Sequence, residues 1–204
     1  MKTLTALVLL GLISLTAAAQ SPGTVRLDVQ PGSRLWLEGG SNIHDWSCKA
    51  STFEAIVDGR PAELSHDSGS VHLEIIQRVT VKVAVRDLKC GNSQMEKDLY
   101  AALKADSASG SQIVGIFSAS PSAGAQGSIV ETDGTIMVAG VEKTVHTQIA
   151  VERRSDGRVT ARGGVPLLMT DFDVKPPTAL RGLVRSHNDV VVRFELILLS
   201  PSSK

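Results

Sequence analysis

The chain has 204 residues, of which 42% are hydrophobic and 3% aromatic, and it carries 21 basic and 21 acidic side chains. That length suits one domain with a sizeable core and is short for two. A charge balance near zero gives no long-range field to gather nucleic acid or an anionic lipid surface, so we expect no nucleic-acid partner.

The first 19 residues have the pattern of a secretory signal peptide. Lys2 supplies the positive start, residues 4–15 are apolar, and Ala17, Ala18 and Ala19 form an A-x-A-like cleavage site. No later run reaches the roughly 18 apolar residues of a membrane-spanning helix. We therefore expect residues 20–204 to form one mature domain that is periplasmic or secreted and has no transmembrane segment.

Most of the remaining chain alternates apolar and polar residues with a period of two, which predicts β-strands. In residues 79–85, Val79, Val81, Val83 and Val85 share one face. The other expected strands span residues 25–37 with a turn at Pro31-Gly32, 53–57, 113–119, 135–139, 144–151, 159–169 and 190–199. Asp-Gly pairs at 58–59, 133–134 and 156–157 predict turns between them.

Short connections predict antiparallel neighbours, including a hairpin that turns at residues 140–143 and a second one through residues 155–157. About eight strands in such a meander favour either a closed barrel or a two-layer sandwich. The chain has only four Phe, two Trp and one Tyr. A barrel built from it would be lined mainly by aliphatic side chains, which tends to leave room inside.

One helix is expected at residues 93–104. Ser93 and Glu96 match a capping box, and Met95, Leu99 and Leu103 follow at helical spacing on one apolar face. This helix would plug or line the mouth of a barrel, or cover an edge of a sandwich.

The two cysteines, Cys48 and Cys90, are disulfide candidates in an oxidising compartment, and two buried free thiols are the alternative. With His44 and Met95 they form the nearest approach to a soft-metal site, although copper sites usually use two imidazoles. We expect no metal and no cofactor.

Catalytic motifs are not found in this sequence. It has no G-x-S-x-G turn and no glycine-rich phosphate loop with its lysine. Asp171 and Asp173 flank Phe172, but a solvated strand end explains the two carboxylates as well as an acid/base pair does. We therefore expect a binding protein and not an enzyme.

Three segments together resemble the YceI-like family of exported, lipocalin-like proteins. They are Gly40-Ser-Asn-Ile-His-Asp-Trp46, then Val85-Arg-Asp-Leu-Lys-Cys90 with residues 95–104, and finally residues 134–143 with 165–177, which include Met-Thr-Asp-Phe and Pro-Pro. The match covers nearly all of residues 25–199.

The resemblance implies an all-β fold: an extended eight-stranded antiparallel lipocalin-like barrel with one short helix at or near a mouth. It also implies a long apolar channel that holds a polyisoprenoid or similar lipid. The ligand-binding candidates that follow from it are Trp46, Met95, Leu99, Leu103, Phe117, Met137, Met169 and Phe172.

The leading hypothesis is thus an exported carrier or reservoir for a long apolar lipid. An apolar mouth would also favour a homodimer. One alternative is a periplasmic redox or metal-binding protein that uses His44, Cys48, Cys90 and Met95. Another is a structural or stress-related barrel with a packed interior.

Overall fold

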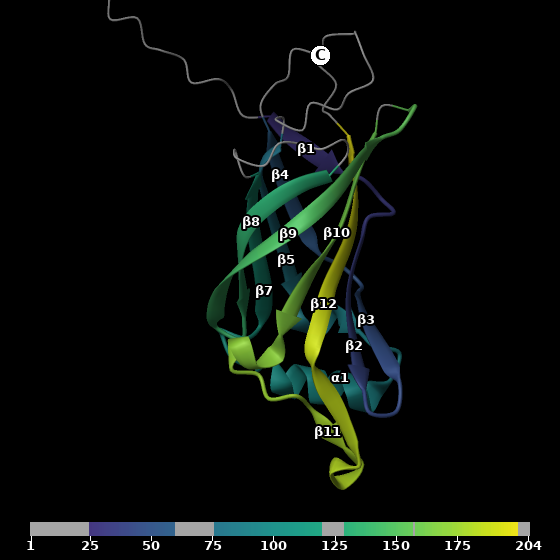
Figure 1. Ribbon diagram of the computed structural model, residues 1–204, viewed down its shortest axis with the longest axis vertical. Helices are drawn as coiled ribbons and strands as arrows, with labels where there is room; N and C mark the ends of the chain where they lie inside the picture. Colours follow the sequence, from purple (N-terminus) through teal and green to yellow (C-terminus); the bar gives the residue numbers. More distant parts are fainter. Residues whose placement is uncertain (1–24, 60–75, 120–128, 157, 200–204) are drawn as a thin grey trace, which may run out of the picture.

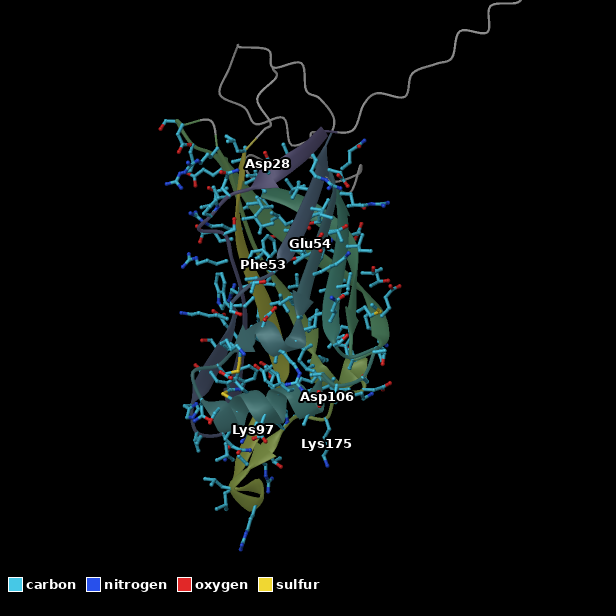
Figure 2. All side chains as sticks on the ribbon, turned by 180° about the vertical axis from the view of Figure 1, so that it is seen from behind. Asp28, Phe53, Glu54, Lys97, Asp106 and Lys175 are labelled. Carbon is cyan, nitrogen blue, oxygen red and sulfur yellow. A yellow bond between two sulfur atoms is a disulfide. The ribbon has the colours of Figure 1, made fainter. Side chains whose placement is uncertain are left out.

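The computed structural model describes residues 25–59, 76–119, 129–156 and 158–199, and these form an elongated antiparallel β-barrel with one α-helix at one end (Figure 1). Asp28 lies at one end of the barrel, and Lys97, on α1, lies near the other (Figure 2). The described strands are β1 (Val25–Val29), β2 (Arg34–Ser41), β3 (Asp45–Ala50), β4 (Glu54–Gly59), β5 (Ile76–Ala84), β6 (Leu88–Lys89), β7 (Gln112–Ala119), β8 (Ile129–Val138), β9 (Val141–Arg153), β10 (Val159–Leu168), β11 (Thr178–Ala179) and β12 (Val184–Leu199). The described helices are α1 (Ser93–Ala102) and the short 3₁₀ helices η2 (Val85–Asp87), η3 (Met169–Phe172) and η4 (Leu180–Gly182).

Eight strands close into a ring. Their order is β1-β4-β5-β7-β8-β9-β10-β12, and β12 pairs back with β1 through Asp28 opposite Leu199 and Val29 opposite Leu198. A sandwich would leave free edges at this seam, whereas a closed ring has none there. The predicted eight-stranded antiparallel barrel is confirmed.

Strand β12 connects the ring to the other strands of the sheet. It has 16 residues, which corresponds to roughly 50 Å of extended chain. Towards its C-terminal end it pairs with β1, and over Ser186–Glu195 it pairs with β2, which continues to β3 and β6. The predicted strand began at residue 190, but β12 begins at Val184. It therefore extends beyond the barrel towards α1 and β11.

Helix α1 is present as predicted, but its N-terminal cap differs from the predicted capping box. Asn92, not Ser93, is the cap, and its side chain accepts hydrogen bonds from the backbone N–H groups of Gln94 and Met95 at 3.0 Å. The Glu96 carboxylate instead accepts from the backbone N–H of Cys90 at 3.0 Å. Asn is among the residues that best satisfy the unpaired N–H groups of a first helical turn.

The predicted turns agree only in part with the structure. The turn at Pro31-Gly32 is confirmed, and the β8–β9 hairpin turns at Ala139 and Gly140, with φ of 52° and 87°, slightly before the predicted position. Asp133-Gly134 is not a turn: both residues lie inside β8, where Gly134 stands opposite Phe117. Gly134 leaves space there for the Phe117 ring. The Asp-Gly pair alone does not distinguish this packing role from a turn.

Candidate functional site

The barrel encloses an apolar cavity of about 120 Å³. No charged side chain of the described residues lines it. The lining residues are Leu35, Trp36, Leu37, Phe53, Val57, Val79, Val81, Val83, Leu88, Ile113, Gly115, Phe117, Val130, Thr132, Ile136, Ile149, Val151, Ala161, Val165, Val192, Phe194, Leu196 and Leu198. Thr132 donates its hydroxyl to the Thr147 carbonyl at 3.1 Å, so this polar group is already paired. Such a surface offers an occupant dispersion and apolar burial but almost no hydrogen bonds.

Period-two alternation puts these side chains inside. On β5, Val79, Val81 and Val83 line the cavity as the sequence pattern predicts, and on β12 the lining residues are Val192, Phe194, Leu196 and Leu198. Their outward neighbours include the polar residues Lys82 on β5 and Arg193 and Glu195 on β12. Glu195, for instance, accepts hydrogen bonds from Arg34 and Arg162. These hydrogen bonds, and that from Arg34 most of all, lower the pKa of Glu195. The charges of β12 are therefore held on the outer face.

Two phenylalanine rings lie against glycine backbone in the barrel wall. A Cβ added at Gly115 or Gly134 would stand 2.9 Å or 2.5 Å from the Phe117 ring, and one added at Gly163 would stand 2.5 Å from the Phe194 ring. Gly134 and Gly163 are the direct cross-strand partners of these two phenylalanines. The missing side chains make room for the rings at the wall, which leaves more of the lumen open.

The free volume is nevertheless modest. An apolar cavity of about 150 Å³ is enough to hold one benzene molecule. The 120 Å³ found here therefore accommodates a short apolar group as it stands. A longer apolar chain needs more space than this, so side chains of the cavity lining must move to admit it.

A second pocket, of about 560 Å³, lies outside the barrel lumen. We call it the outer pocket. Its walls come from the β2–β3 hairpin, the first half of α1, and the segment from β11 to β12. It is more polar than the cavity, because His44, Asp45, Asn92, Gln94 and Asp98 are among its lining residues.

The predicted ligand-binding residues are divided between these sites. Phe117 lines the barrel cavity, whereas Trp46, Met95, Leu99 and Met169 line the outer pocket. Leu103 and Phe172 are 7% and 3% exposed and belong to the core around them. Met137 lines neither space. It is the neighbour of Ile136 on β8, and Ile136 is the one whose side chain lines the barrel cavity. Sequence reasoning missed Phe53 and Phe194 in the cavity wall; on β12, the alternation of Val192, Phe194 and Leu196 was the available signal.

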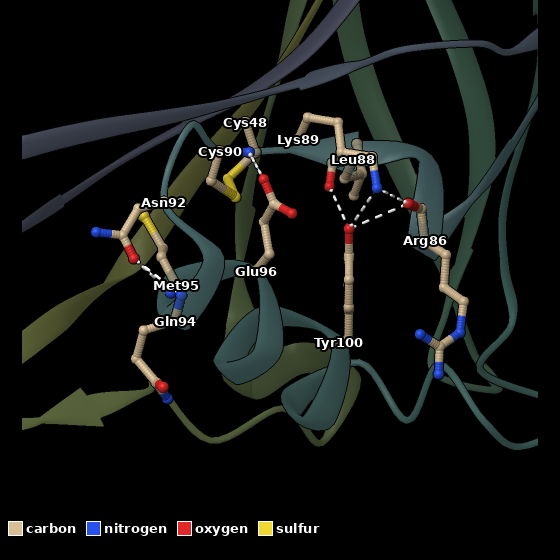
Figure 3. The surroundings of a disulfide bond; sticks show 10 residues. All are labelled: Cys48, Arg86, Leu88, Lys89, Cys90, Asn92, Gln94, Met95, Glu96 and Tyr100. Carbon is tan, nitrogen blue, oxygen red and sulfur yellow. Dashed lines mark hydrogen bonds between the residues drawn. A yellow bond between two sulfur atoms is a disulfide. The ribbon is translucent and has the colours of Figure 1, made fainter.

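The cysteines form a disulfide between β3 and the segment that precedes α1 (Figure 3). Both residues also line the outer pocket. The disulfide removes both sulfurs as thiolate ligands. The side chains left from the soft-metal hypothesis are His44, whose Nδ1 lies 2.9 Å from the Asp45 carbonyl, and Met95. Within the described ranges, no group of three or more His, Cys, Asp or Glu side chains could hold a metal ion. The disulfide counts against the version of the alternative hypothesis in which both cysteine thiolates bind a metal.

None of the helices described here has the length and apolar character needed to cross a bilayer.

No protein-family model matches the sequence, and no curated protein does. Solved structures are similar in fold. BcnA of Burkholderia cenocepacia has a TM-score of 0.65 at 17% identity, over 83% of this chain and 99% of that one. A polyisoprenoid-binding domain from Saccharophagus degradans, implicated in plant cell wall breakdown, has a TM-score of 0.60 at 13% identity, over 86% and 98%. The YceI protein of Campylobacter jejuni has a TM-score of 0.53 at 16% identity, over 76% and 85%. The chain therefore has the fold of the YceI-like barrels.

Proposed function

We propose that the protein is an exported carrier or reservoir that binds a long apolar lipid of the polyisoprenoid type inside its barrel. The observation that carries this proposal is the apolar lining of a closed barrel, with charged side chains held on the outer face. Each buried CH₂ group of a lipid contributes about 0.8 kcal/mol to binding, so affinity needs no polar anchor. Binding without turnover is the expected activity.

Two further observations support the proposal. The Saccharophagus domain that shares the fold is named for polyisoprenoid binding. The signal-like residues 1–19 and the Cys48–Cys90 disulfide both suit an oxidising compartment outside the cytoplasm. Export to a periplasm or to the medium is part of the same proposal.

The test is lipid extraction and native mass spectrometry of the exported protein, followed by uptake of a long-chain prenyl probe by the delipidated protein. We expect a bound apolar lipid at up to one molecule per chain. Val81→Asn places a polar group in the lumen and should weaken uptake, while Thr80→Asn, at the neighbouring position on β5, which does not line the cavity, should leave it unchanged. Equal melting temperatures of the two variants would show that both are folded.

The rival is a barrel whose interior stays packed and has a structural role. The cavity volume of about 120 Å³ favours this rival. The same experiment decides between them, since a packed barrel would yield no co-purified lipid and would take up no prenyl probe.

A further inference from the structure

The most exposed apolar side chains belong to the β2–β3 hairpin and to the segment between β11 and β12, at the end of the molecule where α1 lies (Figure 1). Ile43, Leu180 and Leu183 are 61%, 70% and 74% exposed. The other large hydrophobic residues that the structure exposes, Ile116, Ile129 and Leu168, are between 39% and 46% exposed. We call Ile43, Leu180 and Leu183 the apolar tip.

The tip is a built feature of the fold. Strand β11 pairs with the start of β12, and η4 joins the two strands into a short ribbon that projects beyond the helix (Figure 1). Asn42 fastens the β2–β3 hairpin to this ribbon: its side chain donates to the Leu183 carbonyl at 2.9 Å and accepts from the Arg185 N–H at 2.8 Å. The turn that carries Ile43 is thus fastened to the backbone of Leu183 and Arg185.

The backbone of the tip is strained at Leu180 and at the neighbouring Arg181. Leu180 and Arg181 both have left-handed backbone angles, with φ of 49° and 56°. Glycine or asparagine adopts such angles more easily than leucine does. A segment that only had to turn would gain nothing from an exposed leucine here, and strain of this kind is concentrated at functional positions.

The segment that carries Leu180 and Leu183 has charges of one sign, whereas the outer pocket beside it contains two carboxylates. From Val174 to Ser186 the sequence contains Lys175, Arg181 and Arg185 and no carboxylate, and all three cations are exposed. Asp45 and Asp98 line the outer pocket. The net charge of the whole chain is zero, so this positive region acts locally and at short range.

We propose that the apolar tip docks the barrel onto an anionic lipid bilayer. Ile43, Leu180 and Leu183 would enter the boundary between head groups and acyl chains, while Lys175, Arg181 and Arg185 bind lipid phosphates. Charge argues for a bilayer over a second copy of the chain, because two like tips in a symmetric contact would bring six cations together. Docking goes beyond lipid binding in the barrel and is a property of the empty protein.

The experiment is cosedimentation of the purified, delipidated protein with sucrose-loaded vesicles of phosphatidylcholine, with and without about one third phosphatidylglycerol. We expect binding to the anionic vesicles that weakens as salt is added. Arg181→Gln should lower the partition coefficient about fivefold. Leu180→Ser/Leu183→Ser should lower it roughly 100-fold. The matched control, Ile116→Ser/Ile129→Ser, removes two exposed isoleucines elsewhere on the barrel and should bind as the unchanged protein does.

Three results would overturn the proposal: no binding to anionic vesicles, equal binding to neutral ones, or undiminished binding of the Leu180→Ser/Leu183→Ser variant. Light scattering without vesicles tests the other possible occupant of the tip, a second copy of the chain. If the unchanged protein is a dimer and this variant a monomer, the tip is an interface between copies and docking is refuted. Prenyl uptake is measured separately, so the lipid-carrier proposal and the docking proposal can fail independently.

Discussion

The free space inside the barrel depends on glycines that lie against the rings of Phe117 and Phe194. Gly115 is the cleanest place to change it, because a Cβ there would meet only the far edge of the Phe117 ring, at 2.9 Å. At Gly134 the added atom would also meet the Ile116 carbonyl oxygen at 2.5 Å. We expect Gly115→Ala to push the Phe117 ring into the lumen and to reduce prenyl uptake roughly tenfold. A loss of this size corresponds to one or two methylene groups of the lipid that are no longer buried.

The control is a second change that makes the ring smaller. Gly115→Ala/Phe117→Leu restores space in the lumen and should restore uptake, measured by native mass spectrometry of each delipidated variant. A crystal structure of Gly115→Ala should place the ring closer to the barrel axis. Unchanged uptake with a displaced ring would show that Phe117 does not limit the occupant.

The pKa of His146 is shifted by carboxylates on the neighbouring strand. His146 stands opposite Asp133 on the neighbouring strand, its Nδ1 bonds the Asp133 carboxylate, and its Nε2 lies 3.3 Å from Glu131. The hydrogen bond to Asp133, followed by the charge of that carboxylate, raises the pKa of His146 above 6.5. The folded state thus favours the protonated imidazole, and the pair contributes stability that is fully present below pH 6.5 and is lost as pH rises through the raised pKa.

An NMR titration of the imidazole tests this shift. We expect a midpoint above 6.5, and a lower midpoint in Asp133→Asn, where the principal partner has lost its charge. Because the group is on the surface, added salt should also lower the midpoint of the unchanged protein. A midpoint at or below 6.5 would contradict the ion pair.

At the scale of elements, the disulfide fixes α1 to the barrel. Cys48 is fully buried on β3, Cys90 stands two residues before the helix cap, and the bond closes a loop with a sequence separation of 42. Closing such a loop stabilises by about 4 kcal/mol in the chain-entropy model. We expect Cys48→Ala/Cys90→Ala to lose about 2–4 kcal/mol of unfolding free energy in urea, and to melt roughly 5–15 °C lower.

Reduction provides the control for this prediction. A strong reductant should lower the melting temperature of the unchanged protein towards that of the double variant and leave the variant where it is. A double variant as stable as the oxidised protein would show that contacts of α1 such as the Tyr100 hydroxyl, 2.8 Å from the Leu88 carbonyl, hold the helix without the bond.

Elements were predictable wherever a long periodic pattern defined them. The alternation in β5 and the apolar positions of α1 gave the right type of structure, because burial of one face imposes those periods. Errors arose where one residue type serves two purposes. Gly134 reads as a turn former but receives the Phe117 ring, and Ser93 reads as a cap beside Asn92, which is the actual one.

At the scale of the whole molecule, the local pattern did not decide between barrel and sandwich. The difference lies in the pairing of β1 with β12, some 170 residues apart, which no local period reports. Family resemblance supplied the barrel. The lumen was harder still: the resemblance suggested Met137, which lines neither space. Phe194 was missed, because the period of β12 places it inside only once the inner face of that strand is known. Long-range register decides such positions.

Closure of the ring makes its own prediction about stability. Leu198 is 1% exposed and stands opposite Val29 of β1 on one side and Val159 of β10 on the other. Leu198→Ala should cost about 2–5 kcal/mol of unfolding free energy, whereas Ile129→Ala, at a residue 46% exposed, should cost less than about 0.5 kcal/mol.

Because every strand of the ring is paired on both sides, weakening the seam should destabilise the barrel as one unit. In urea, tryptophan fluorescence reports Trp36 and Trp46 on β2 and β3, away from the seam, and far-ultraviolet circular dichroism reports all strands. We expect both signals of Leu198→Ala to move together to a lower midpoint with an unchanged slope. An early transition seen by circular dichroism alone would mean that β1 and the end of β12 separate first, with the rest of the barrel still folded.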